Sequence, residues 1–222
     1  MNKFTFKNKP INANGGFNPI TKIEGAVRAV TYDENKRPVI EITPSDLPFI
    51  VRHTIYGSVD YFLAEYFAAT GVVANTLTDL VDKDITLYKY KIGEYTVQSL
   101  MADVPVGYHV ATFKGIDEAE INGVSVVAIK ALVDDKLTWA LFFVPNDTAA
   151  QRVMKTLGQV AKSLGLSGEV SFEAIEALVD KPIGINRVMS ETYSSIYTNF
   201  VTPGYAQEKS NVPQTASTDD DF

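Results

Sequence analysis

Two stretches of nearly identical sequence, far apart in the chain, constrain the fold more than any other feature. Residues 80–85 read LVDKDI and residues 178–183 read LVDKPI, 98 positions later. At the same offset Leu77 corresponds to Ile175 and Lys89 corresponds to Arg187. Self-similarity at a fixed offset indicates a repeated structural unit. The chain is therefore predicted to contain two related domains.

A second pair of segments predicts one helix in each copy. Residues 58–71 align with residues 152–165, 94 positions later, and the apolar residues of both segments recur at helical spacing. Both segments end at a glycine, Gly71 and Gly165, the residue that most often ends a helix in the left-handed conformation. The change of offset from 94 to 98 is a four-residue insertion in the following loop, where insertions are tolerated.

Strand-like runs surround each predicted helix in the same order. Three runs precede it, at 23–33, 37–43 and 48–55 in the first copy and at 106–118, 123–135 and 137–145 in the second. A short helix and a strand pair follow it, at 75–82 and 85–101 and again at 171–180 and 183–201. About five short strands with a helix after the third is the element order of the OB-fold, a small barrel that commonly binds oligonucleotides.

We therefore predict a chain that is mainly β with α (α+β), built from two tandem OB-fold-like barrels that arose by internal duplication. The first domain covers residues 1–102 and includes a basic N-terminal arm, and the second covers residues 103–203. Residues 204–222 lack apolar periodicity and are rich in small and polar residues, so they are predicted to form a flexible, disordered acidic tail.

The residue inventory argues against catalysis. The chain has no cysteine, which excludes disulfides, thiolate metal sites and cysteine nucleophiles. The two histidines, His53 and His109, both lie in predicted strands, and neither a phosphate loop nor a nucleophile elbow is present. We expect no enzymatic activity, no cofactor and no metal. The acidic residues of the turns at 117–120 and 134–135 leave a metal-dependent nuclease as an alternative.

The remaining sequence signals concern location. No apolar run approaches the roughly 20 residues of a membrane span, and the N-terminal residues lack the apolar stretch of a secretory signal. We expect a cytoplasmic protein with no membrane partner, which fits the absence of cysteine.

Aromatic and basic residues of the strands are the candidates for binding. The net charge of −7 disfavours broad electrostatic attraction to nucleic acid, so a bound nucleic-acid strand would have to occupy a local groove of the protein. In residues 87–96, strand alternation places Lys89 and Lys91 on one face and Tyr88 and Tyr90 on the other. Cations beside aromatic faces suit single-stranded nucleic acid, because each nucleotide offers a charge and a ring. Half-buried strands also carry such residues.

The other predicted DNA-binding residues share this aromatic or basic character. They are Arg28, Lys36, Arg37, Arg52 and Tyr95 in the first copy, and Lys114, Lys130, Arg187, Tyr193 and Tyr197 in the second. Tyr32, Tyr108, Phe113 and Trp139 are further aromatic candidates, of which Trp139 is equally expected in the core.

The last residues, STDDDF, resemble the C-terminus of single-stranded DNA-binding proteins of bacteria and phages. The segment 138–166, TWALFFVPNDTAAQRVMKTLGQVAKSLGL, with the LVDK strand after it, is also similar to small phage proteins of this class. The resemblance implies a protein that coats single-stranded DNA without sequence preference during replication or recombination, in the host cytoplasm if phage-encoded. It further implies that Asp219, Asp220, Asp221 and Phe222 recruit a polymerase, helicase or recombinase and compete with DNA phosphates.

An alternative from another class is a protein-interaction or virion structural module without nucleic-acid binding. In that case the aromatic strands would form an interface, and a homo-oligomer would be expected.

Overall fold

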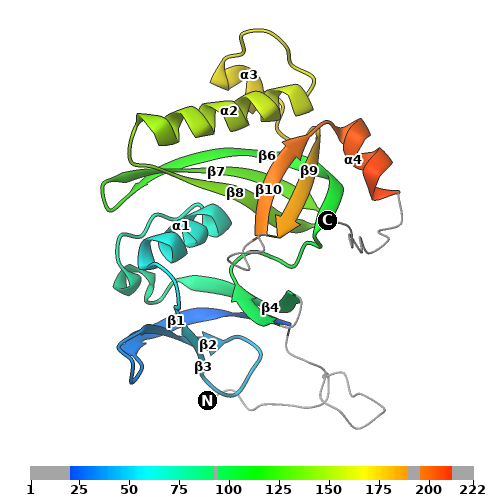
Figure 1. Cartoon of the computed structure of the whole chain (residues 1–222). Coiled ribbons are helices and arrows are strands. Elements are labelled where there is room, and N and C mark those ends of the chain that lie inside the picture. Colours follow the sequence, from blue (N-terminus) through cyan, green and yellow to red (C-terminus); the bar gives the residue numbers. More distant parts are fainter. Residues whose placement is uncertain (1–20, 93–94, 190–195, 212–222) are drawn as a thin grey trace, which may run out of the picture. The chain divides into compact units, whose positions relative to one another are not determined.

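The computed structural model describes residues 21–92, 95–189 and 196–211 (Figure 1). The chain divides between Asp103 and Val104 into two compact units, except that Ala119–Val124 are grouped with the first. Each unit is mainly β with helices and contains one five-stranded antiparallel sheet. Unit 1 and unit 2 below are these two units, except that the strands at 107–121 and 124–133 are assigned whole to unit 2, to whose sheet they belong.

Unit 1 contains strands β1 (Lys22–Tyr32), β2 (Pro38–Pro44) and β3 (Val51–Thr54), followed by helix α1 (Val59–Thr70) and the 3₁₀ helix η2 (Leu77–Leu80). Strands β4 (Asp84–Ile92) and β5 (Tyr95–Ser99) complete it, and the sheet order is β3-β2-β1-β4-β5. Its core side chains are fully buried and include Val27, Ile40, Ile42, Leu63, Leu80 and Leu87.

Unit 2 contains β6 (Gly107–Ile121), β7 (Val124–Val133), β8 (Lys136–Val144), α2 (Asp147–Ser163) and α3 (Phe172–Glu176). It ends with β9 (Pro182–Met189), β10 (Ile196–Val201) and α4 (Pro203–Ser210). The sheet order is β10-β9-β6-β7-β8. Numbered within each unit, both sheets therefore have the strand order third, second, first, fourth, fifth.

The repeated LVDK sequence forms the same turn in both units. Asp82 and Asp180 have left-handed φ angles of 65° and 68°. The Asp82 N–H donates to the carbonyl of Val27 over 2.8 Å, and the Val27 N–H donates back to the carbonyl of Lys83 over 2.9 Å. In unit 2 the Asp180 N–H donates to the carbonyl of Phe113 over 2.8 Å, and the Phe113 N–H donates to the carbonyl of Lys181 over 2.9 Å. The sequence repeat therefore has a structural counterpart in each first strand.

The two aligned helices end alike and begin differently. Gly71 follows α1 with φ of 75°, and Gly165 follows α2 with φ of 83°, both left-handed. α2 begins at Asp147, five residues before the aligned segment starts, because the side chain of Asn146 accepts a hydrogen bond from the Ala149 N–H over 3.0 Å. The second helix therefore extends beyond the repeat at its N-terminal end.

The expected closed barrels are not confirmed, because neither five-stranded sheet closes within the described residues. The third and fifth strands form the two edges of each sheet, and in each unit one side-chain hydrogen bond joins them. His53 Nδ1 of β3 lies 2.8 Å from Gln98 Oε1 of β5, and Thr198 Oγ1 of β10 donates to the Trp139 carbonyl of β8 over 3.3 Å. We call this line between the third and fifth strands the seam of each sheet.

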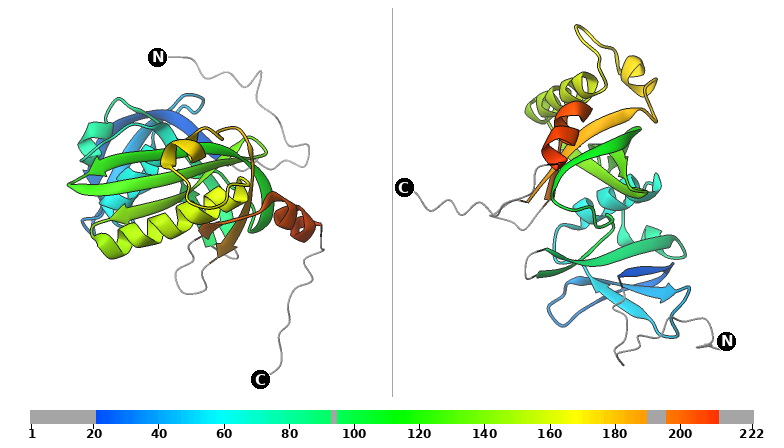
Figure 2. Two further views of the ribbon diagram at one scale, coloured as in Figure 1. Left: turned by 90° about the horizontal axis from the view of Figure 1, so that it is seen from above. Right: turned by 90° about the vertical axis from the view of Figure 1, so that its right-hand side faces the viewer.

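The prediction that a flexible tail starts at residue 204 is wrong. Residues Pro203–Ser210 form α4, which packs against β9 (Figure 2). Pro203 at the first helical turn suits helix initiation, Ala206 is fully buried, and the Tyr205 ring meets Tyr108 edge-on at 5.5 Å. This helix was missed because its apolar contacts come from two consecutive residues and give no periodicity.

A buried hydroxyl joins α2 to the end of the unit 2 sheet. The Ser163 Oγ–H donates to the Val201 carbonyl, and the same oxygen accepts a hydrogen bond from the Gly184 N–H over 3.1 Å. A side chain at position 184 would place its Cβ 2.5 Å from the Val201 carbonyl oxygen, so only glycine fits there. The hydroxyl therefore satisfies a backbone N–H at a point where the strands approach closely.

We predict that Ser163→Ala lowers the free energy of unfolding of unit 2 by about 1–3 kcal/mol, because the buried Gly184 N–H loses its acceptor. The fluorescence of Trp139, which is the only tryptophan of the sequence and is buried in unit 2, reports the transition in urea. Thr156→Ala on the same helix is the control, because that hydroxyl bonds only to its own helix at Arg152. Equal effects of the two substitutions would contradict this role of Ser163.

Candidate nucleic-acid interface

Unit 1 has a cavity of about 200 Å³ at its seam, between β3, β5 and the N-terminal half of α1. Tyr56, Tyr61 and Phe62 supply aromatic walls, and His53, Glu65 and Gln98 supply polar groups. We call it the seam cavity. It combines rings and hydrogen-bonding groups in one concave site, which is the general character of ligand sites.

The strand ladders determine which polar groups reach the seam cavity. His53 pairs with Ile40 of β2, and Gln98 pairs with Lys89 of β4. Burial lowers the pKa of His53, so the ring is neutral at neutral pH and its Nδ1–H donates to Gln98 Oε1. The His53 ring also lies 5.7 Å from the Phe62 ring, between their centroids. These contacts hold the imidazole and the amide in fixed positions.

Glu65 of α1 is the least expected member of this site. Its side chain is half-buried in the cavity wall, and burial raises its pKa to about 7. Across the described ranges 21–92, 95–189 and 196–211, the structure records no hydrogen bond or ion pair of this carboxyl. A carboxyl with unmet hydrogen-bonding capacity in a cavity is a typical feature of functional sites.

Two cations lie next to residues that line the seam cavity, and we call their position its rim. The Arg37 guanidinium stacks over the Tyr56 ring at 4.8 Å from its centroid, while its Nε donates to Asp33 over 2.8 Å. Lys89 is the ladder partner of Gln98, so the two side chains share a face of the sheet. The side chain of Lys89 is exposed. The cavity is thus bordered by one paired and one exposed cation.

The other predicted residues of unit 1 are distributed along its strands and turns. In the described part of the unit, the side chains of Arg28, Lys36, Lys89 and Lys91 are exposed and make no recorded ion pair. Arg52 faces Glu41 over 3.6 Å, and Lys22 lies 5.9 Å from the Tyr88 ring. Tyr90 is half-buried, and the side chain of Tyr95 lies outside what the structure describes.

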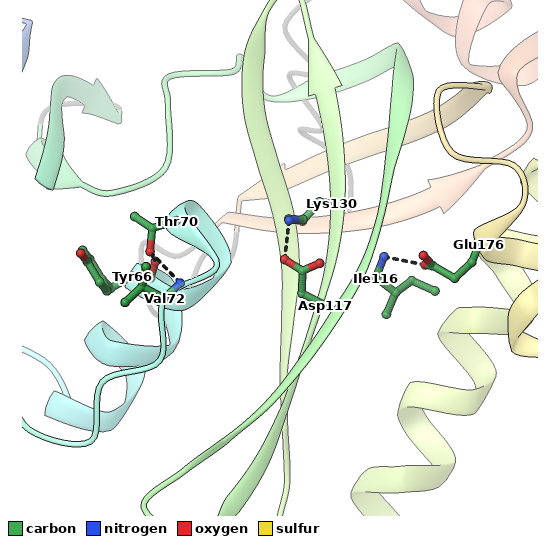
Figure 3. A network of polar contacts seen from close by, with 7 residues as sticks. All are labelled: Tyr66, Thr70, Val72, Ile116, Asp117, Lys130 and Glu176. Atoms are coloured by element: carbon green, nitrogen blue, oxygen red, sulfur yellow. Dashed lines mark hydrogen bonds and ion pairs between the residues drawn. The ribbon is translucent and has the colours of Figure 1, made fainter. Parts of the chain in front are cut away.

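The predicted cations of unit 2 are engaged within the unit. Lys114 pairs with Asp180 over 2.6 Å, and Lys130 pairs with Asp117, as Figure 3 shows. The expectation that Arg187 holds a phosphate at the surface is wrong, because its side chain is only 1% exposed and donates to Thr138 Oγ1 over 2.7 Å. Arg187 corresponds to Lys89 in the repeat. The two units therefore differ at the position where both were expected to have a phosphate-binding cation.

The aromatic candidates of unit 2 are also divided between surface and core. Tyr197 is 52% exposed, whereas Phe113 and Trp139 are buried. Tyr193 and the tail residues Asp219, Asp220, Asp221 and Phe222 lie outside the described residues. Unit 2 therefore offers one described aromatic of the predicted set to solvent.

A second cavity, of about 270 Å³, lies between α2 and α3 of unit 2. Met154, Leu157, Phe172 and Ile175 line it, with Lys162 as its one lysine. Met154 is 66% exposed and Phe172 is 39% exposed, so an apolar surface faces solvent here. This groove differs from the seam cavity in its small share of polar groups.

Comparison with known proteins adds no family to this description. No protein-family model matches the sequence, and no curated protein is significantly similar to it.

The turn acids of the nuclease alternative have a structural role. Asp134 and Asp135 both adopt left-handed φ angles, of 47° and 64°, in the turn between β7 and β8. The acids at 117–120 are not in a turn as expected but inside β6, where Asp117 pairs with Lys130. Among the described residues, no three histidine or acidic side chains gather as metal ligands would, and no helix has the length and apolarity needed to cross a membrane.

Sequence reasoning missed most of the seam cavity. It treated His53 as a plain strand residue and did not consider Tyr56, Tyr61, Glu65 or Gln98. One signal was present, because Glu65 interrupts an otherwise apolar helix face three residues after Phe62. The seam itself joins strands 45 residues apart in sequence, so no local pattern identifies it.

We predict that Glu65→Gln changes stability in a pH-dependent way. Between the ordinary pKa of 4.5 and about 7, the folded protein keeps a proton that the unfolded chain releases, so the wild type loses stability as pH rises through this range. The variant has no such loss. At pH 8 it should exceed the wild type by on the order of 3 kcal/mol more than at pH 5, since one pKa unit corresponds to about 1.4 kcal/mol.

Hydrogen exchange of the α1 amides at the two pH values measures this difference within unit 1. Glu34→Gln is the control, because it removes an exposed carboxyl from the same unit. A stability difference between Glu65→Gln and wild type that stays constant from pH 5 to pH 8 would show that the Glu65 carboxyl is not held protonated.

Proposed function

We infer that the protein binds single-stranded DNA without sequence preference and that unit 1 is the principal binding surface. The observation that carries this proposal is that unit 1 exposes three tyrosines and, on β4, the two predicted cations Lys89 and Lys91. Tyr32, Tyr56 and Tyr61 are 67%, 77% and 49% exposed. Exposed rings provide stacking surfaces for bases, and cations beside them attract phosphates.

Unit 2 supports the proposal through its difference from unit 1. Its candidate cations Lys114 and Lys130 are paired with Asp180 and Asp117, and Arg187 is buried and donates to Thr138, so none of the three is free at the surface. A negatively charged chain that binds DNA needs a restricted basic region, and unit 1 has one along β4 at Lys89 and Lys91. The element order of the two units, with a helix after the third strand, is the one that suggested the OB-fold, although fold alone does not determine function.

The tail is proposed to connect bound DNA with other proteins of replication or recombination. Asp219, Asp220 and Asp221 are three consecutive acidic residues, and the apolar Phe222 follows them in the sequence. A basic pocket with an apolar centre on a polymerase, helicase or recombinase would recognise both features. The resemblance of STDDDF to phage-type proteins supports this role, and a phage origin with it.

A second candidate function is protein binding through unit 2. The apolar groove between α2 and α3, with its exposed Met154 and Phe172, favours it. This surface suits an apolar peptide segment, and it is compatible with DNA binding by unit 1. Protein binding by this groove would be the main function only if the protein does not bind DNA.

We predict that the double substitution Lys89→Gln and Lys91→Gln weakens binding of a labelled dT 20-mer, measured by fluorescence anisotropy over a salt series. Loss of two phosphate contacts should make the slope of log affinity against log salt shallower by about 1.4. The matched control is Lys155→Gln with Lys162→Gln on α2, which removes the same charge from unit 2. If the control variant loses as much affinity as the test variant, unit 1 is not the principal surface. If wild type does not bind at low salt, the proposed function fails.

We also predict that deletion of residues 217–222 tightens DNA binding, because the tail carboxylates no longer compete with phosphates. The same deletion should abolish binding to the replication partner, measured in a pull-down with a polymerase, helicase or recombinase from the same source. Unchanged affinity for DNA together with unchanged partner binding would remove the tail from the proposal.

A further inference from the structure

The carboxyl of Glu65 needs an explanation that the fold does not supply. It lines the seam cavity, it is half-buried, and the described residues provide it with no hydrogen bond or ion pair. Withdrawing a carboxyl from water without a partner is costly, and this cost is what raises its pKa to about 7. A ligand that hydrogen-bonds to this carboxyl would recover part of the cost.

The surroundings of Glu65 restrict the chemistry of such a ligand. Tyr56 and Tyr61 are exposed rings at the cavity, and Phe62 lies deeper at 7% exposure. The amide of Gln98 accepts from His53 through Oε1, which leaves its NH₂ group as a donor. Flat aromatic walls with a carboxyl and an amide suit a planar ring that carries donors and acceptors along one edge.

The volume of the seam cavity and the cations at its rim agree with a nucleobase that is attached to a sugar-phosphate backbone. A cavity of about 200 Å³ is smaller than the roughly 300–1,000 Å³ of drug-sized sites, so it admits one small ring system. Arg37 stacks on Tyr56 at the rim, and Lys89 stands beside Gln98 in the ladder. A nucleotide whose base enters the cavity would leave its phosphate at the level of these cations.

We propose that the seam cavity of unit 1 holds one unstacked nucleobase of the bound strand, with the Glu65 carboxyl hydrogen-bonded to the edge of that base. This inference rests on the proposed function, because it assigns the place where one base of a single strand enters the protein. It adds a site formed by His53, Tyr56, Tyr61, Glu65 and Gln98 to the strand residues predicted from sequence.

The protonation state of Glu65 determines which nucleobase edges can form two hydrogen bonds with its carboxyl. A neutral carboxyl presents one donor and one acceptor, which match a neighbouring donor and acceptor on the pairing edge of thymine, cytosine or adenine. An ionised carboxylate presents acceptors alone, so it loses one of the two contacts with thymine. Binding of dT at this site therefore weakens as pH rises through 7, while binding of the phosphates does not depend on this group.

Other titratable groups lie at or near the seam cavity, and the experiment distinguishes their contribution to the pH dependence from that of Glu65. His53 from β3, Tyr56 from the loop before α1 and Tyr61 from α1 line the cavity, and Arg37 and Lys89 stand at its rim. All of them are retained in Glu65→Gln. The difference between wild type and this variant at each pH therefore isolates the carboxyl.

The experiment measures the affinity of the full chain for two labelled 20-mers, oligo-dT and an abasic oligodeoxyribose phosphate of the same length, at pH 6 and pH 8. Wild type should bind oligo-dT up to about ninefold more weakly at pH 8, because the protonated fraction of a group with a pKa near 7 falls from about 0.9 to 0.1. Its affinity for the abasic oligomer should be the same at both pH values.

Two variants complete the test. Glu65→Gln keeps one donor and one acceptor at every pH, so its affinity for oligo-dT should not change between pH 6 and pH 8. Tyr56→Ala should weaken oligo-dT binding by about fivefold or more and leave abasic binding nearly unchanged, since stacking on one ring contributes roughly 1–3 kcal/mol. Phe49→Ala, which removes an exposed aromatic ring of unit 1 that does not line the cavity and is not a predicted binding residue, is its matched control.

The outcomes separate this inference from the proposed function. If wild type binds oligo-dT with a pH dependence equal to that of Glu65→Gln, the base site is wrong while DNA binding stands. If Tyr56→Ala weakens abasic and oligo-dT binding equally, the cavity contacts the backbone and the base site is also wrong. If wild type binds neither oligomer at low salt, the proposed function itself fails.

Discussion

The reciprocal backbone pair between the LVDK turn and the first strand is the interaction on which each unit depends. It fixes Val27 against residues 82–83 and Phe113 against residues 180–181 with nearly the same distances in both units. The turn determines where the fourth strand begins, at Asp84 and Pro182, and therefore its register against the first strand. Four hydrogen bonds of the main chain, two in each unit, therefore accompany this short sequence wherever it occurs in the chain.

The two units share this turn and the strand order, and they differ in the side chains at equivalent positions. The repeat places Lys89 and Arg187 at the same position, yet Lys89 is exposed beside the seam cavity and Arg187 is buried against Thr138. An exposed lysine remains in solvent at little cost, whereas a buried guanidinium requires several polar partners. The cation of unit 1 at this position is therefore exposed, and the cation of unit 2 is part of the interior.

The sequence was sufficient for features that depend on local patterns. The repeat, the glycine helix ends at Gly71 and Gly165, and the order of strands follow from periodicity and turn residues, and the structure has them. Features that depend on distant pairs were not accessible in this way. The burial of Arg187 depends on Thr138, the open seam depends on strands that meet only in the fold, and α4 depends on a surface of β9. Glu65 was visible in the sequence as a charged residue in an apolar helix, but only the structure shows that it lines a cavity.

The seam has a consequence for the behaviour of the chain in concentrated solution. A sheet that does not close keeps backbone donors and acceptors along its outer strands, and these can recruit strands of other molecules into aggregates. In unit 1 the outer strand β3 spans only Val51–Thr54 and carries the charged Arg52, and both properties discourage such pairing. The brevity of β3 thus protects against self-association while it leaves space beside α1 for a guest molecule.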